Sequence, residues 1–192
     1  MTVLVKKNLP SGTIVISRPE KRNAMSPQLH KDMTAVLEDL RYDDEARVLV
    51  LGGMGKAFCA GMDLSTGSNV FGLDETLSPS LAELQAGWDD REIVKGVRDT
   101  GGRVSLAVFD CKKPVIAAIN GHAFGNGALL ACTCDFLFMR SDKWFFCFPE
   151  VDVSIPFLPG MIASLSGTAT TMVSLEVNIG EGVCEGGTTR VS

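Results

Sequence analysis

Hydrophobic and polar positions follow two different periods along most of the chain. The segments TVLVKK and GTIVISR are rich in β-branched residues and flank the turn NLPSG, so they predict two paired strands. Ser26 and Pro27 have the residue types of a helix N-cap and a first helical residue. Apolar residues then recur at helical spacing up to Leu40, which predicts an amphipathic helix over residues 27–40.

The next apolar runs predict buried strands. RVLVLGG and KPVIAAING are typical of strands that are covered on both faces, and DFLFMRSD and WFFCFPE predict two shorter ones. A loop is expected over residues 65–80 and a weaker helical pattern covers residues 81–110. Further helices are expected from about Asn126 and after Pro159. This alternation of strands and helices predicts an α/β fold.

Composition narrows the class of protein. The 192 residues are 45% hydrophobic with a net charge of −5, which fits one globular domain and argues against a nucleic-acid partner. No apolar run is long enough to span a membrane, and the N-terminus lacks the pattern of a secretory signal. The C-x-C spacing of Cys132 and Cys134 is not that of a zinc site, so no metal is expected. The six cysteines predict buried free thiols and a reducing compartment, cytoplasmic or peroxisomal, although TRVS is not a peroxisomal tripeptide.

Two glycine-rich segments have the same predicted order of elements. VLVLGGMGKAFCAGMDL and VIAAINGHAFGNGALLA each predict a buried strand, a glycine-rich turn and the start of a helix. Glycine lets the backbone approach a ligand closely, and a helix start carries unpaired N–H groups. Two such N–H groups aimed at one point would form an oxyanion hole. A purely structural turn explains each segment equally well on its own.

Few titratable residues suit catalysis. Glu150 follows the apolar run WFFCFP, and such surroundings raise the pKa of a carboxyl group and suit it to acid–base work. The alternative is an exposed residue at a strand end. Asp152 is a second candidate, with a turn or capping role as its alternative. His30 is expected on the exposed face of the first helix and His122 as a hydrogen-bonding loop residue.

Four segments occur together and in order: RPEKRNAM, KAFCAGMDL, KPVIAAINGHAFGNGALLACTCDF and FPEVDVSIPFLPGM. In them the chain resembles the crotonase superfamily, the enoyl-CoA hydratases and isomerases, over residues 3–165. The resemblance implies a ββα spiral core, a coenzyme A thioester as substrate, no other cofactor, and a homo-trimer. The Gly- and Thr-rich residues 166–192 depart from the family, in which further helices cover the site and build the trimer. We therefore expect a core over residues 1–165 and an atypical, shortened C-terminus.

The resemblance also implies roles for individual residues. The backbone N–H groups of Met62 and Asn126 would form the oxyanion hole; the family usually has glycine at the position of Asn126. The RPEKRNAM loop would line the coenzyme A nucleotide. Its predicted contacts are Lys21 and Arg22 with the phosphates, Ala24 with the adenine, and the backbone of Cys59 and Ala60 with the same moiety.

The reaction is predicted from three positions. Of the two glutamates of the family's hydratases, the first falls on Leu129 and the second on Glu150, and a further acid of dienoyl-CoA isomerases falls on Leu158. One remaining carboxylate resembles the pattern of an isomerase that converts 3-enoyl-CoA to 2-enoyl-CoA. The alternatives are a hydratase, a hydroxycinnamoyl-CoA hydratase-lyase, which the parts NAMSP and AGMDL resemble, and a shortened, inactive acyl-CoA-binding or assembly subunit.

Overall fold

The computed structural model describes residues 2–66, 100–139 and 145–150. The predictions for residues 67–99, for Asp152 and Leu158, for a helix after Pro159 and for the segment 166–192 lie outside these ranges.

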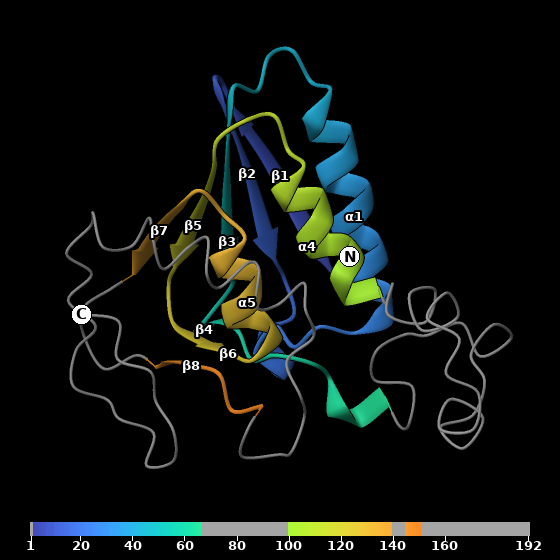
Figure 1. Cartoon of the computed structure of the whole chain (residues 1–192), viewed down its shortest axis with the longest axis vertical. Helices are drawn as coiled ribbons and strands as arrows, with labels where there is room; N and C mark the ends of the chain where they lie inside the picture. The colour runs from blue at the N-terminus through green and yellow to red at the C-terminus, as the bar shows by residue number, and fades with distance from the viewer. Residues whose placement is uncertain (1, 67–99, 140–144, 151–192) are drawn as a thin grey trace, which may run out of the picture.

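A five-stranded sheet forms one side of the molecule (Figure 1). Its strand order is β1-β2-β3-β5-β7; β1 and β2 pair in antiparallel fashion and the other neighbours are parallel. This confirms the predicted opening hairpin and the central apolar strands. In β3 and β5 buried positions alternate with half-buried ones, so one face of each strand is buried and the expected cover of both faces is only partial. The strand bounds are β1 Val3–Asn8, β2 Ser11–Ile16, β3 Val48–Gly53, β5 Val115–Ile119 and β7 Phe136–Met139.

A smaller parallel sheet lies beyond the carboxyl ends of these strands (Figure 1). It contains β4 (Ala57–Cys59), β6 (His122–Phe124) and β8 (Phe146–Cys147). Each of them follows a strand of the large sheet, so the chain passes from β3 to β4, from β5 to β6 and from β7 to β8. With α4 (Thr100–Phe109) and α5 (Asn126–Cys132), strand, strand and helix recur in turn. The predicted α/β fold with a ββα spiral core is therefore correct.

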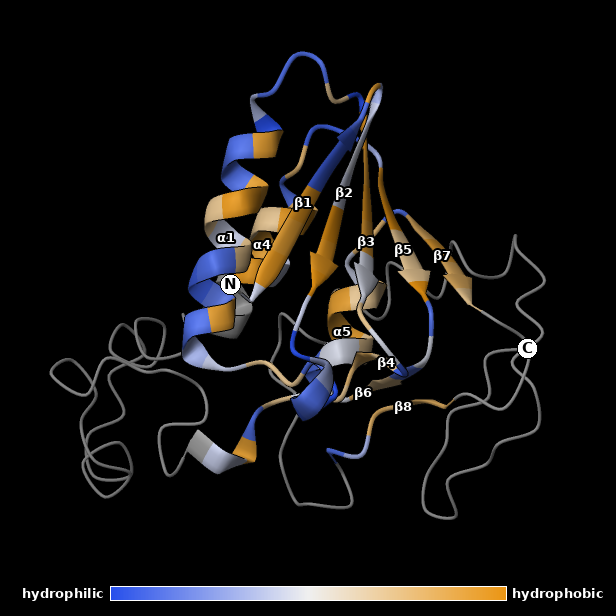
Figure 2. Cartoon of the chain, turned by 180° about the vertical axis from the view of Figure 1, so that it is seen from behind, coloured by the Kyte–Doolittle hydropathy of each residue, from blue (hydrophilic) through white to orange (hydrophobic). Residues whose placement is uncertain are grey.

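Helix α1 (Pro27–Arg41) begins where the sequence predicts and buries the predicted apolar residues. The Ser26 hydroxyl accepts a hydrogen bond from Leu29 N–H at 3.2 Å, which satisfies one of the free amides of the first turn. In Figure 2 the hydrophobic side of α1 faces the sheet and α4, and its charged side faces outward. The core contains Ile14, Ile16, Leu29, Met33, Leu37, Leu49, Leu51, Phe58, Val104, Val115, Ala117 and Leu130.

Two short 3-10 helices complete the described fold, at Pro19–Lys21 and Leu64–Thr66. None of the helices in the described ranges is both long and apolar enough to cross a membrane.

Candidate active site

The two glycine-rich crossings meet at the start of α5. A Cβ atom built on Gly61 would lie 3.8 Å from the backbone nitrogen of Asn126. One built on Gly127 would lie 2.4 Å from the carbonyl oxygen of Cys59, closer than any side chain can approach. The missing Cβ of Gly127 thus lets α5 pack directly against β4. Segments more than 60 residues apart in the sequence are thereby brought side by side.

The backbone N–H of Met62 points away from Met25, the residue with which Met62 forms a bridge. Met25 N–H donates to Gly61 O at 2.7 Å, and Asp63 N–H donates to Met25 O at 2.9 Å. Met25 and Met62 thus form a parallel bridge in which only the residues on either side of Met62 bond to Met25. The N–H of Met62 points to the opposite side, and within the described ranges it has no backbone acceptor.

Asn126 is the first residue of α5, as predicted. The helix follows Gly125, whose φ of +50° is a conformation that glycine adopts readily. Gly125 N–H donates to Cys147 O, and the first helical bond runs from Leu129 N–H to Gly125 O, both at 2.9 Å. An amide of the first helical turn lacks a partner in its own helix. The Asn126 N–H therefore remains available, with no backbone acceptor among the described residues.

Glu150 lies beside this helix start. A Cβ atom on Gly125 would be 2.9 Å from Glu150 Oε1. The Glu150 residue is 8% exposed, and its Oε2 atom is buried without a hydrogen-bond partner in the described structure. Burial raises the pKa of the carboxyl group, and a hydrogen bond from its own backbone N–H opposes the shift. The alternative of an exposed strand-end residue is wrong, and the raised pKa follows from the predicted cause.

No second carboxylate from α5 accompanies Glu150. Leu129 occupies α5 one turn after Gly125 and is 3% exposed, so its position offers only apolar surface. Within the described ranges no group of three or more metal-ligating side chains occurs.

The loop after β2 meets the turn after β4. Ala60 N–H donates to Arg22 O at 3.0 Å, so Ala60 and Cys59 lie beside the segment that contains Lys21, Arg22 and Ala24. Lys21 and Arg22 are exposed, and Lys21 Nζ donates to Ser65 Oγ at 3.4 Å. Both residues therefore lie at the surface next to the backbone of this turn. The structure brings together all five residues that the resemblance assigns to the nucleotide.

Two polar residues of this loop face inward, which the sequence analysis did not predict. Asn23 is fully buried and donates to Met54 O and Ala57 O at 2.9 and 2.8 Å. Arg18 forms a salt bridge of 2.9 Å with Asp63, the residue after Met62, and also donates to Ala24 O. A polar loop gave no sign of which side chains turn inward. The Arg18 bond holds the loop against the Met62 turn, and the Asn23 bonds hold it against the connection from β3 to β4.

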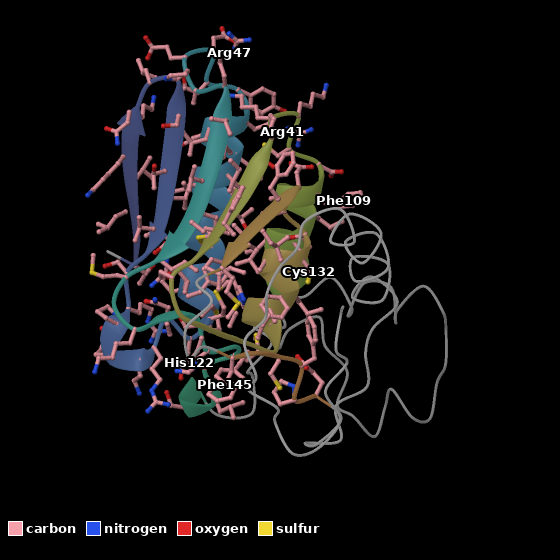
Figure 3. The ribbon with its side chains drawn as sticks, turned by 90° about the vertical axis from the view of Figure 1, so that its left-hand side faces the viewer. Arg41, Arg47, Phe109, His122, Cys132 and Phe145 are labelled. Carbon is pink, nitrogen blue, oxygen red and sulfur yellow. The ribbon has the colours of Figure 1, made fainter. Side chains whose placement is uncertain are left out.

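Both histidines contact the small sheet or α5. His30, predicted on the surface, is fully buried, and its Nε2 lies 3.4 Å from Asn126 Nδ2. The prediction was wrong because His30 lies on the buried face of α1, three and seven residues before Met33 and Leu37, where its ring meets the start of α5. His122 Nδ1 accepts a hydrogen bond from Phe145 N–H at 3.3 Å, and the two rings stack (Figure 3). This confirms a hydrogen-bonding role for His122, which lies in strand β6 and not in the predicted loop.

The thiols near the site are protected. Cys59 is buried, and burial raises its pKa to about 12. Cys132 at the end of α5 and Cys134 just after it are buried too, and none of the described cysteines forms a disulfide. Cys111 alone of the described cysteines is partly exposed. The expectation of buried thiols outside disulfides is thus correct for the other four, and burial raises the pKa of Cys59, Cys132 and Cys134, which disfavours their thiolates.

Comparison with known proteins agrees with this geometry. The model of the enoyl-CoA hydratase/isomerase family matches residues 11–166. The chain belongs to this family, and its fold is the crotonase fold.

The names of similar proteins give different activities. The chain is 30% identical over 154 residues to a peroxisomal Δ(3,5)-Δ(2,4)-dienoyl-CoA isomerase of Arabidopsis thaliana, covering 79% of the chain and 52% of the relative. It is 36% identical over 163 residues to a hydroxycinnamoyl-CoA hydratase-lyase of Pseudomonas fluorescens, covering 83% and 52%. A solved enoyl-CoA hydratase/isomerase from Mycobacterium paratuberculosis superimposes with a TM-score of 0.64 at 26% identity, covering 93% of this chain and 64% of that one. The chain spans about half the length of the curated relatives it matches.

Proposed function

We propose that this chain is an acyl-CoA isomerase that converts 3-enoyl-CoA to 2-enoyl-CoA with one glutamate base. The observation that carries the proposal is the position of Glu150 beside Gly125, at the start of α5, with Leu129 where a second carboxylate would be needed for a hydratase of the family. Family membership supports the coarser statement that the substrate is an acyl-CoA.

The proposed chemistry uses two backbone amides and one carboxylate. The thioester oxygen accepts hydrogen bonds from Met62 N–H and Asn126 N–H. Glu150 takes a proton from C2 and thereby forms a dienolate, whose negative charge the two amides stabilise. The protonated Glu150 then returns the proton to C4, and the double bond comes to rest between C2 and C3. Each amide of such a pair contributes about 3–4 kcal/mol to the transition state.

Burial suits Glu150 to both steps. A buried carboxylate with one oxygen unpartnered is a stronger base than one that water solvates fully, because less of its charge is stabilised. A raised pKa also keeps the abstracted proton on Glu150 near neutral pH until it is delivered to C4, whereas an exposed glutamate would lose it to water. This proton transfer needs no cofactor beyond the thioester itself.

The rest of the substrate is proposed to lie along the loop after β2. Lys21 and Arg22 would bind the phosphates of coenzyme A, Ala24 would contact the adenine, and the backbone of Cys59 and Ala60 would line the same moiety. The contact between Ala60 and Arg22 supports one continuous surface from this loop to Met62.

One assay separates the candidate activities. The full chain is incubated with 3-enoyl-CoA and formation of the conjugated 2-enoyl thioester is followed, with hydration of 2-enoyl-CoA measured in parallel. The proposal predicts isomerisation faster than hydration. Faster hydration would establish a hydratase instead. A rise in melting temperature on adding acyl-CoA, without turnover, would establish an acyl-CoA-binding subunit.

A second candidate is a hydroxycinnamoyl-CoA hydratase-lyase. It is favoured by the 36% identity with the hydratase-lyase of Pseudomonas fluorescens. The same assay with hydroxycinnamoyl-CoA tests it, because cleavage releases an aromatic aldehyde that absorbs at a different wavelength from the thioester. Aldehyde formation at a higher rate than isomerisation would replace our proposal.

We also propose a homo-trimer, as the resemblance implies. Light scattering on the purified chain measures its mass directly. A mass of one chain would contradict this part of the proposal without affecting the chemistry assigned to Glu150.

A further inference from the structure

His30 and Asn126 meet although they are 96 residues apart in the chain. His30 lies in the first turn of α1 and Asn126 opens α5. Their side-chain atoms Nε2 and Nδ2 are 3.4 Å apart, a long hydrogen bond between two part-buried groups. The imidazole itself is fully buried.

The chemistry of the two groups fixes the direction of this bond. Burial lowers the pKa of His30 to about 4, so its ring is neutral at physiological pH and has one donor and one acceptor nitrogen. The Asn126 amide nitrogen can only donate. His30 Nε2 is therefore the acceptor, and the ring proton is on Nδ1.

The hydrogen bond to His30 holds the side chain of Asn126, which lies close to the proposed base Glu150. Asn126 follows Gly125, against which Glu150 Oε1 lies, yet its carboxamide bonds to α1 and not to Glu150. Glu150 Oε2 accordingly keeps no partner among the described residues. The seven-residue helix α5 has no side-chain N-cap, so the side chain of its first residue is fixed from outside the helix.

We infer that His30 is a positioning residue, which holds the Asn126 side chain and through it the direction of the Asn126 backbone N–H. Where the family usually has glycine, this chain has a side chain, and His30 keeps that side chain on the α1 side of the site. The effect on turnover rests on the proposed function; the effect on the amide does not.

The first experiment follows the Asn126 amide by NMR in the ¹⁵N-labelled full chain. His30→Phe removes the acceptor and keeps an aromatic ring, His30→Gln keeps an acceptor, and Met33→Leu is a control one turn further along the same buried face. We expect His30→Phe to shift the Asn126 backbone resonance, and His30→Gln and Met33→Leu to leave it near its wild-type position. Equal shifts in His30→Phe and Met33→Leu would overturn the inference.

The second experiment measures turnover in two backgrounds. His30→Phe is expected to lower kcat roughly 3–10-fold, as for one neutral hydrogen bond, with KM nearly unchanged and with recovery in His30→Gln. In the Asn126→Gly background His30→Phe should cost nothing further, because the side chain that it acts through is gone. The same loss in both backgrounds would show a merely structural role. If the wild-type chain has no turnover, the proposed function fails, and the NMR comparison alone decides the inference.

Discussion

The carboxyl group of Glu150 lies against the backbone of Gly125, at the distance where a single added methyl group would touch it. A Cβ atom on Gly125 would stand 2.9 Å from Glu150 Oε1 and 3.6 Å from Cδ. The end of the small sheet thus presents a buried acid to the start of α5, where an unpaired amide is available. The proposed base Glu150 and the proposed oxyanion hole therefore lie next to each other.

We predict that Gly125→Ala impairs the site more than the fold. The new methyl group would displace Glu150, and the backbone of Gly125, with φ +50° and ψ −121°, is in a region that alanine rarely adopts. Turnover should fall by at least tenfold and stability by about 1–3 kcal/mol, the cost of holding a residue in a sparsely populated backbone conformation. Gly52→Ala is the matched control, because a Cβ there would only touch Ala118 O at an ordinary 3.6 Å. Steady-state kinetics and denaturant unfolding measure both effects; wild-type turnover in Gly125→Ala would contradict the assigned geometry.

The raised pKa of Glu150 predicts two effects of pH with opposite signs. The base must be ionised, so kcat/KM should fall as the pH drops through a midpoint above 4.5, the ordinary value for glutamate. Between 4.5 and the raised value the folded chain binds more protons than the unfolded chain, so the contribution of Glu150 to stability falls as pH rises through this window. Rate profiles and melting curves across pH measure these effects. A wild-type melting profile that matches that of Glu150→Gln across the window would contradict the raised pKa.

The buried pair of Arg18 and Asp63 should matter for stability. The two side chains are 16% and 6% exposed, and Asp63 also accepts hydrogen bonds from Ser65. Arg18→Leu should cost about 3 kcal/mol, the low end for a broken buried pair, because Ser65 still bonds to Asp63. Urea unfolding measures the loss. The half-exposed pair of Lys7 and Asp43 is the control, and Lys7→Leu should change stability little. Equal losses in the two variants would show that Arg18 does not hold the loop.

The exposed cations of the loop after β2 should act on substrate binding alone. Lys21→Ala and Arg22→Ala are each expected to raise KM for an acyl-CoA about 2–5-fold, as for one exposed ion pair. They should leave KM for the matching acyl-pantetheine unchanged, since it lacks the nucleotide phosphates. Lys31→Ala, an exposed change on α1, is the control. Equal increases for both substrates would move the nucleotide away from this loop.

Long periodic elements of the fold could be predicted from the sequence, and short ones could not. The helix from Pro27 and the apolar strands β3 and β5 carry clear patterns, because one covered face repeats over five or more residues. The three-residue strands β4 and β6 lie inside the glycine-rich turns and are too short to show a period. Their pairing is decided by residues distant in sequence.

Some features of the site could likewise be predicted from the sequence and others could not. The resemblance placed Met62, Asn126 and Glu150 in one site, and the structure brings their segments together. Patterns within one segment could not reveal the inward turn of Arg18 and Asn23, because it depends on partners from another part of the chain. The burial of His30 could have been predicted, because His30 is three and seven residues before Met33 and Leu37 on one face of α1.

The substitution Glu150→Gln tests the central claim most directly. The side chain keeps its shape and loses its basicity, so conversion of 3-enoyl-CoA to 2-enoyl-CoA should fall by about 10²–10⁴-fold while acyl-CoA binding is retained and the chain stays folded. Glu38→Gln, an exposed change on α1, should behave as wild type. If Glu150→Gln turns over 3-enoyl-CoA at the wild-type rate, Glu150 is not the base and the account is contradicted.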